Sequence, residues 1–321
     1  MEYRGLIVKM PANVQNPRTA AMGADMAQSR ALPYHGLLHT REMPMTAFRL
    51  TAAILTLLLA PLPAALAQTN GQIERPSTCL AMAQALPGVI YASLATPSLM
   101  ISVAARADPV TITYAGHSTY LIETPAGVTI ATDFAGIYGA NPPPRVVTMN
   151  KAHGTHFTRN PDPAIEHVLP GWNEEGGPVK HSLLVEDVYI RNVTTDIRRY
   201  GAMEPDANSI FIFEVAGLCI GHLGHLHHRL DDSHYAAIGR LDVLMVPVDG
   251  GLTLSLDGMS EIARRLSSSV ILPMHRHSTP LSAFTGRMGG GFELDFREGR
   301  SITVALDNLP RRPTIVILDG V

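Results

Sequence analysis

The chain has 321 residues, of which 46% are hydrophobic and 17% are charged, and its formal net charge is −3. A chain of this length and composition can bury a full core, which excludes a disordered or fibrous protein. The small negative charge provides no broad basic surface, so we expect no nucleic-acid partner.

The first informative segment is an apolar run near the N-terminus. Arg49 precedes the apolar residues 50–59, and the small residues Ala65-Leu66-Ala67 end the run. This order is typical of a secretory signal peptide, and its apolar core is shorter than the ~20 residues of a transmembrane helix. We therefore predict a signal peptide over 45–67, no stable membrane span in the mature protein, and a periplasmic or secreted location. Residues 1–44 show no periodic pattern and are predicted to be a gene-model extension or disordered.

Residues 68–108 contain an apolar, Ala-rich stretch that is predicted to form a helical N-terminal extension. The segment holds Cys79, and the only other cysteine, Cys219, lies in a predicted apolar strand. An oxidising compartment permits a disulfide, but two buried free thiols fit the sequence equally well. Both possibilities stay open at this point.

Residues 109–321 are predicted to form a single domain in which short strands occur in both halves. Strands are expected at 110–114, 119–124, 128–132, 145–149, 188–194, 209–215, 218–222, 241–248 and 270–273. Helices are expected from Asp231 or Asp232 to Gly239, and from a cap at Asp257 to Leu266. Strands in both halves with helices between them indicate an α+β fold in which two sheets pack face to face, with helices outside.

Histidines are concentrated at the ends of these strands. Twelve of the 14 histidines follow residue 110, and they include His117, His153, His156, His222, His225, His227, His228, His275 and His277. Strand ends can aim several side chains at a common point while a loop leaves a coordination position open. A single histidine would more often be structural, but four groups at four strand ends indicate a metal site.

Several of these segments together resemble a known family. The runs at 112–133, 219–225, 238–251 and 270–275 resemble, in order and spacing, the metallo-β-lactamase-fold hydrolases. The resemblance is greatest to the branch that includes ascorbate-phosphate lactonases and N-acylphosphatidylethanolamine phospholipase D, and it covers residues 110–320. It implies an αββα sandwich of two mixed β-sheets with helices outside, and a metal at the active site.

The sequence departs from the family's metal-binding pattern. The family motif H-x-H-x-D-H falls on Lys151, His153, Thr155 and His156, so its first histidine and its aspartate are missing. The position of the aspartate that bridges two metals in the family holds His225. Residue by residue, the resemblance implies the metal ligands His153, His156, Asp196, His225 and His275.

This altered set still suits a metal, because imidazoles and a carboxylate are good ligands for zinc or another divalent first-row metal. Since the two-metal set is incomplete, we expect one ion rather than two. His222, His227, His228 and Asp249 offer further donors that could replace the missing ligands.

Three further residues are candidates for catalysis. Lys151 or His117 is expected to stabilise a developing oxyanion, and Asp133 to orient a ligand histidine or accept a proton. Asp133 fits a turn cap equally well, and His117 fits a tight turn. The only tryptophan, Trp172, either faces the substrate or anchors its long loop.

These observations predict an exported metal-dependent hydrolase that uses metal-activated water on an ester, a lactone or a phosphodiester of a small molecule. The alternative is a catalytically inactive metal- or ligand-binding protein on the same scaffold, because part of the family motif is missing. Neither the substrate nor the oligomeric state follows from the sequence.

Overall fold

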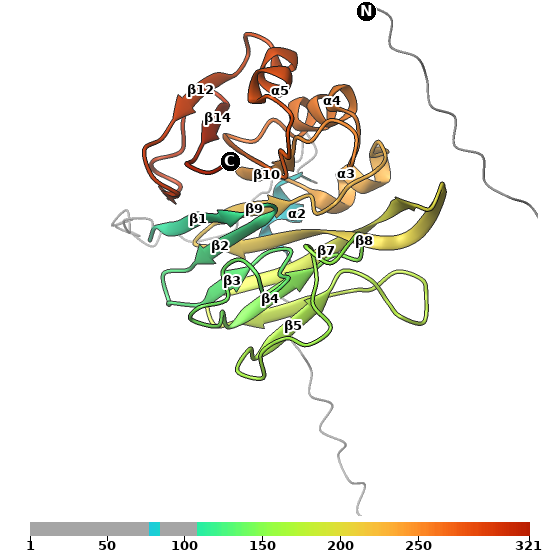
Figure 1. Ribbon diagram of the computed structural model, residues 1–321. Helices are drawn as coiled ribbons and strands as arrows, with labels where there is room; N and C mark the ends of the chain where they lie inside the picture. The colour runs from blue at the N-terminus through green and yellow to red at the C-terminus, as the bar shows by residue number, and fades with distance from the viewer. Residues whose placement is uncertain (1–76, 84–107) are drawn as a thin grey trace, which may run out of the picture. The chain divides into compact units, whose positions relative to one another are not determined.

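The structure of the protein is a computed structural model that describes residues 77–83 and 108–321 (Figure 1). These residues all belong to one compact unit. The predicted segments at 1–44 and 45–67, and the predicted mature terminus near Gln68, lie outside the described residues. Within the described part, no helix is long and apolar enough to cross a membrane.

The first sheet has six strands in the order β13-β1-β2-β3-β4-β5. Residues of β1 are alternately buried and partly buried, because every second side chain faces the interior. The sheet is mixed, since β1 to β3 pair antiparallel and β3 to β5 pair parallel. The strands are β1 (Val110–Gly116), β2 (Thr119–Glu123), β3 (Thr129–Ala131), β4 (Val146–Met149), β5 (His167–Pro170) and β13 (Ser301–Val304).

The second sheet has eight strands in the order β12-β14-β11-β10-β9-β8-β7-β6. Its antiparallel half runs from β6 to β9, and its parallel half runs from β9 to β12. The strands are β6 (Ser182–Val185), β7 (Val188–Arg199), β8 (Ala202–Val215), β9 (Leu218–His222), β10 (Val243–Pro247), β11 (Val270–Met274), β12 (Glu293–Phe296) and β14 (Thr314–Ile317). All residues of β9, β10 and β11 are buried, as expected for parallel strands covered on both faces.

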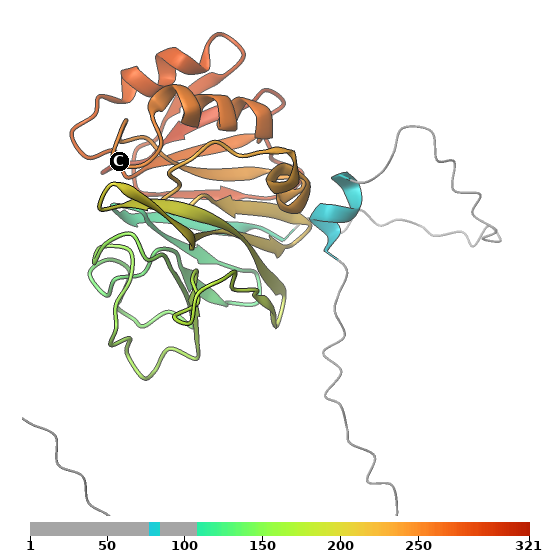
Figure 2. The same ribbon diagram turned by 90° about the vertical axis from the view of Figure 1, so that its right-hand side faces the viewer.

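Two layers of apolar side chains hold the sheets and helices together. One layer lies between the sheets and includes Ile112, Ile122, Phe213 and Met245. The other lies between the eight-stranded sheet and its helices, which Figures 1 and 2 show gathered on one side of the sheets. The helices are α2 (Thr78–Ala83), α3 (Asp232–Ile238), α4 (Leu256–Leu266) and α5 (Leu281–Met288).

The predicted α+β sandwich of two mixed sheets is confirmed. Among the described residues, however, helices cover only one of its outer faces. Loop residues cover the six-stranded sheet, where Phe134, Ile165 and Trp172 pack against Val147 and Met149. The first of these loops, 134–144, contains three consecutive prolines and two glycines, which oppose helix formation.

Trp172 is part of this loop packing. Its side chain is buried, its ring lies 5.5 Å from that of Phe157, and its Nε1 donates a hydrogen bond to Glu174 at 2.9 Å. Of the two possibilities that the sequence left open, the structure shows an anchor for the long loop.

The helix caps agree with the sequence in one case and differ in the other. Asp231 caps α3 by accepting a hydrogen bond from the amide of His234. The cap of α4 is Ser255, which accepts from the amide of Gly258, so the prediction of a cap at Asp257 was wrong. Asp257 instead lies in the first turn, where its charge is favourable for the helix dipole.

Helix α2 is attached to β8 and β9 by a disulfide and by a buried carboxylate. Cys79 and Cys219 form a disulfide with their Cα atoms 6.0 Å apart, which settles the question left open by the sequence. Glu214 accepts hydrogen bonds from the amide of Thr78 at 2.9 Å and from Arg191 Nε at 2.8 Å. Burial opposes ionisation of Glu214, but hydrogen bonds from Arg191 and Ser77 lower its pKa below the usual value.

Candidate metal centre

Four histidines that follow strands of both sheets lie close together at the ends of these strands. His117 follows β1, His153 and His156 lie in the loop after β4, and His275 follows β11. One ring nitrogen of each lies within 4.8 Å of the others. The amide of His275 also donates to the carbonyl of His117 at 2.7 Å, which connects the two sheets at this point.

The backbone conformation is unusual at two of these histidines and at Asp133. His117, Asp133 and His275 have φ values of 55°, 44° and 49°, in the left-handed region that non-glycine residues seldom adopt. Such conformations persist only where the surrounding structure holds them, and they are concentrated at functional sites. Here they turn the chain sharply just beyond the strand ends.

Two of the histidines are held from behind by carboxylates. Nδ1 of His156 lies 2.7 Å from Oδ2 of Asp133, and Nδ1 of His275 lies 2.9 Å from Oδ2 of Asp249. An ionised carboxylate only accepts hydrogen bonds, so each Nδ1 carries a proton, and in the neutral imidazole Nε2 then carries the lone pair. Both Nε2 atoms are buried without a hydrogen-bond partner among the described residues.

The pKa values of these carboxyl groups support their ionised form. Burial opposes ionisation of both. The nearby His222 and His156 nevertheless lower the pKa of Asp133. Hydrogen bonds from His275 and Thr253 hold the pKa of Asp249 well below its usual range. Both groups are therefore acceptors at neutral pH.

Asn150 holds Asp133 in place. Its Nδ2 donates to Asp133 Oδ1 at 2.7 Å, and its Oδ1 accepts from the amide of Ser209 at 2.7 Å. Gly224 leaves room for this arrangement, because a Cβ at that position would lie 2.4 Å from both Asn150 Nδ2 and Asn208 Oδ1. Its φ of 62° also favours glycine.

Thr155, at the position of the missing family aspartate, links the other two histidines. Its hydroxyl oxygen lies 2.9 Å from Nε2 of His117 and 2.8 Å from Nδ1 of His153. Burial, with the neighbouring histidines, lowers the pKa of His117 to about 3 and that of His153 to about 4. Both rings are therefore neutral at pH 7, the state in which imidazole binds metals.

His225 lies directly beside the four clustered histidines. Its ring is 4.6 Å from that of His156 and 4.8 Å from that of His275, and its buried Nε2 has no partner among the described residues. Its Nδ1 lies 2.6 Å from Nε2 of His227. The structure therefore brings four of the five predicted ligands together, namely His153, His156, His225 and His275, and adds His117.

The fifth predicted ligand, Asp196, is not part of this cluster. It lies in β7, where its Oδ1 accepts from the amide of Asp206 at 3.1 Å. Lys151, predicted to stabilise an oxyanion, forms an ion pair with Glu204 at 2.8 Å. The structure thus directs the Lys151 charge toward β8.

The remaining donors noted in the sequence have structural partners. His222 Nε2 lies 2.9 Å from the carbonyl oxygen of Ser118, and His228 Nε2 accepts from the amide of Asp196 at 3.1 Å. Asp249 hydrogen-bonds to Nδ1 of His275, and Nε2 of His227 hydrogen-bonds to Nδ1 of His225. Asp249 and Asn150 follow strand ends as the histidines do, and Thr155 lies at the position of the missing family aspartate, but the sequence does not show that these residues hold the histidines and Asp133.

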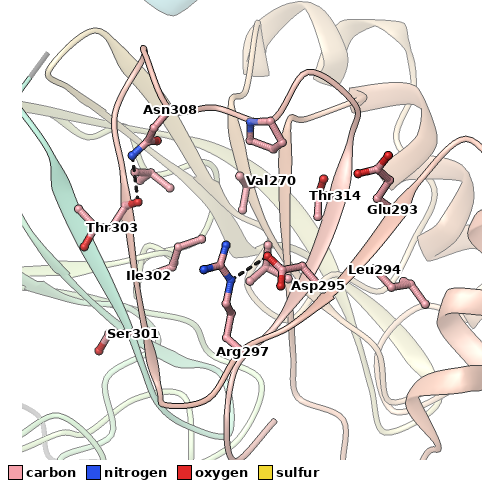
Figure 3. Close-up of a pocket in the computed structure, with 13 residues that line it drawn as sticks. Val270, Glu293, Leu294, Asp295, Arg297, Ser301, Ile302, Thr303, Asn308 and Thr314 are labelled. Carbon is pink, nitrogen blue, oxygen red and sulfur yellow. Dashed lines mark hydrogen bonds and ion pairs between the residues drawn. The ribbon is translucent and has the colours of Figure 1, made fainter.

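A separate cavity of about 700 Å³ opens between β13 and the strands β12 and β14. Figure 3 shows its polar lining, in which Arg297 Nε lies 2.7 Å from Asp295 Oδ2. None of the clustered histidines lines it, so it is not the metal centre.

Comparisons with known proteins found one family profile and several similar solved structures. A family profile described as a beta-lactamase superfamily domain matches residues 111–275. A structure from Thermotoga maritima, described as a Zn-dependent hydrolase of the metallo-β-lactamase superfamily, is 26% identical, with 65% of this chain and 98% of that chain covered and a TM-score of 0.46. No curated protein matches the chain.

Two further similar structures have lower identity. One is described as a metal-dependent hydrolase from Parabacteroides distasonis (16% identity, 56% of this chain and 89% of that chain covered, TM-score 0.44). The other is a metallo hydrolase from Ignicoccus hospitalis (17% identity, 56% and 90% covered, TM-score 0.42). The family profile spans half of this chain and all four clustered histidines. The chain therefore belongs to the β-lactamase superfamily and has the metallo-β-lactamase fold.

Proposed function

We propose that the protein is an exported metal-dependent hydrolase that acts on an ester, a lactone or a phosphodiester of a small molecule. The observation that carries the proposal is the pair of buried Nε2 atoms of His156 and His275, each backed by a carboxylate. Buried polar atoms normally have partners, so unpartnered ring nitrogens in a histidine cluster indicate a ligand site.

The donor set fits a metal ion. His117, His153, His156 and His275 would hold zinc or another divalent first-row metal, for which neutral imidazoles are suitable ligands. We infer one ion rather than two, because the carboxylates of Asp133 and Asp249 hydrogen-bond to Nδ1 of His156 and His275 and are therefore not left to bind a second ion. When bound, such an ion supplies activation of water and polarisation of a carbonyl or phosphoryl oxygen.

The surrounding residues orient the ligands. Asp133 and Asp249 hold His156 and His275 with their Nε2 lone pairs turned inward, and Thr155 positions His117 and His153. In this proposal His117 acts as a ligand, and Asp133 acts as the partner of a ligand. The carboxylates of Asp133 and Asp249 thus hold ligand histidines and do not point toward the metal.

The first experiment is metal analysis of protein purified without added metal, combined with turnover of a panel of lactones and phosphodiesters. We expect about one metal per chain and turnover that a chelator abolishes. His156→Ala should lose both metal and activity. The matched control His167→Ala alters a histidine of β5 outside the cluster and should retain both. A protein that binds metal and turns over nothing would favour the binding-protein alternative.

Export is a separate part of the proposal. It is supported by the signal-like run at 45–67 and by the Cys79–Cys219 disulfide, a bond that persists in oxidising compartments. N-terminal sequencing of the exported protein should find a terminus near Gln68. An intact Met1 or Met45 on exported protein would contradict this assignment.

A further inference from the structure

We propose that His225 is not a metal ligand but presents a protonated Nε2 to the site, where this N–H donates a hydrogen bond to an oxygen of the substrate. The role toward substrate rests on the proposed hydrolase function. The position of the proton rests on three hydrogen-bonding groups of the described chain, Arg198, His227 and His225 itself.

The first step is the backbone amide of Arg198. This N–H donates to Nδ1 of His227. A backbone amide can only donate, so Nδ1 of His227 must carry a lone pair. The proton of the His227 ring is therefore on Nε2.

The second step carries the assignment to His225. Nε2 of His227 lies 2.6 Å from Nδ1 of His225, and because His227 is the donor, Nδ1 of His225 is the acceptor. The ring proton of His225 must then be on Nε2. A nitrogen that carries a proton has no lone pair to give to a metal.

The fold explains why Arg198 reaches His227. The pairing of β7 with β8 shifts register between Thr195 and Ile197. The amides of Asp196 and Arg198, two residues apart and hence on the same side of the strand, both donate to histidine rings. Asp196 donates to Nε2 of His228, whose Nδ1 in turn donates to a carbonyl oxygen at 2.8 Å.

The arrangement of His225 is thus opposite to that of its neighbours. His156 and His275 have acceptors behind them and turn lone pairs inward, whereas His225 has a donor behind it and turns an N–H inward. All three Nε2 atoms are buried without a partner among the described residues. The ring of His225 also lies 5.0 Å from that of His153, so it borders three of the four clustered histidines.

This position suits a donor for developing negative charge. A preorganised N–H in a site shielded from water stabilises the oxygen on which charge accumulates during hydrolysis. The side chain of His225 is only 3% exposed, which provides that shielding. The family resemblance implies a metal ligand at this position. The hydrogen bonds of His225 in this chain instead imply a hydrogen-bond donor.

The proposal is tested by determining the tautomer of His225. Long-range ¹H–¹⁵N correlation spectra of the full mature chain, labelled with ¹⁵N-histidine, show which ring nitrogen carries the proton. The signals are assigned with His225→Gln. We expect the Nε2-protonated form in both the metal-free and the zinc-loaded protein. An Nδ1-protonated form, or coordination of zinc through Nε2, would overturn the proposal. Neither reading depends on turnover, so absence of hydrolase activity would refute the proposed function separately.

A pair of variants tests the cause. His227→Glu places an acceptor behind His225 and still accepts from the Arg198 amide, so it should move the His225 proton to Nδ1. The freed Nε2 should then raise zinc affinity about 10-fold, the scale of changes around metal ligands. The matched control His228→Glu adds the same charge one residue further along and should change neither. An unchanged His225 tautomer in His227→Glu would contradict the inferred relay.

Zinc binding by a third variant completes the test. His225→Ala should keep its zinc stoichiometry, because the four clustered histidines remain, and should lose turnover through loss of the donor. Loss of the bound zinc from folded His225→Ala would show that His225 is a ligand.

Discussion

Nδ1 of His156 lies 2.7 Å from Oδ2 of Asp133, and both side chains are fully buried. The carboxylate fixes the tautomer of the imidazole, which in turn decides that Nε2 is available to a metal. Asp133 thus sets both the orientation of the His156 ring and the position of its proton, although Asp133 does not itself face the metal centre.

Asp133→Asn should lower zinc affinity ~10–100-fold, because the amide is a weaker and ambiguous partner for Nδ1 of His156. Competition with a chromophoric chelator measures this affinity. Asp187→Asn is the control, since Asp187 accepts hydrogen bonds from Thr124 and Ala126 outside the cluster. Equal affinity of the two variants would show that Asp133 has no role in metal binding.

Gly224→Ala should destabilise the protein and weaken metal binding together. The new Cβ would enter the space of Asn150 and Asn208, and Asn150 holds Asp133. Gly176→Ala is a matched control, because Gly176 also has a positive φ but no atom near a new Cβ. The control should lose only ~1–2 kcal/mol of unfolding free energy and no zinc affinity. Urea unfolding and zinc titration of both variants check this, and equal losses would contradict it.

Removing the disulfide should affect stability but not metal content. Cys79 and Cys219 are 140 residues apart in sequence, and cross-links that close long loops restrict the unfolded chain most. The double variant Cys79→Ser, Cys219→Ser should lose ~2–5 kcal/mol of unfolding free energy. Urea unfolding and metal analysis measure the two quantities. Metal loss from the folded variant would show that α2 supports the site.

The metal-free protein should lose stability as the pH falls from about 6.5 toward 4. The pKa values of His117 and His153 are lowered to about 3 and about 4 in the folded state. Below pH ~6.5 the unfolded chain therefore binds protons that the folded chain does not, whereas above it both states are neutral. Melting temperatures of the apoprotein across this range measure the effect. The double variant His117→Gln, His153→Gln should show a shallower slope, and an equal slope would contradict the assignment.

Residue patterns alone determined much of the architecture. Alternating apolar residues located β1, and short apolar runs bounded by turn residues located the fully buried strands β4, β9, β10 and β11. The same reasoning placed His153, His156 and His275 at strand ends, where the structure brings them together. Composition likewise limited the chain to a globular fold.

Only the tertiary structure decided which donors face the centre and how they carry their protons. Asp196 lies at the register shift in β7 and outside the cluster, the Arg198 amide donates to His227, and His117, which has a left-handed backbone, belongs to the cluster. The Cys79–Cys219 bond likewise depends on how α2 lies against β9. Register, backbone handedness and hydrogen-bond direction arise from contacts between segments distant in sequence, and local residue patterns do not contain them.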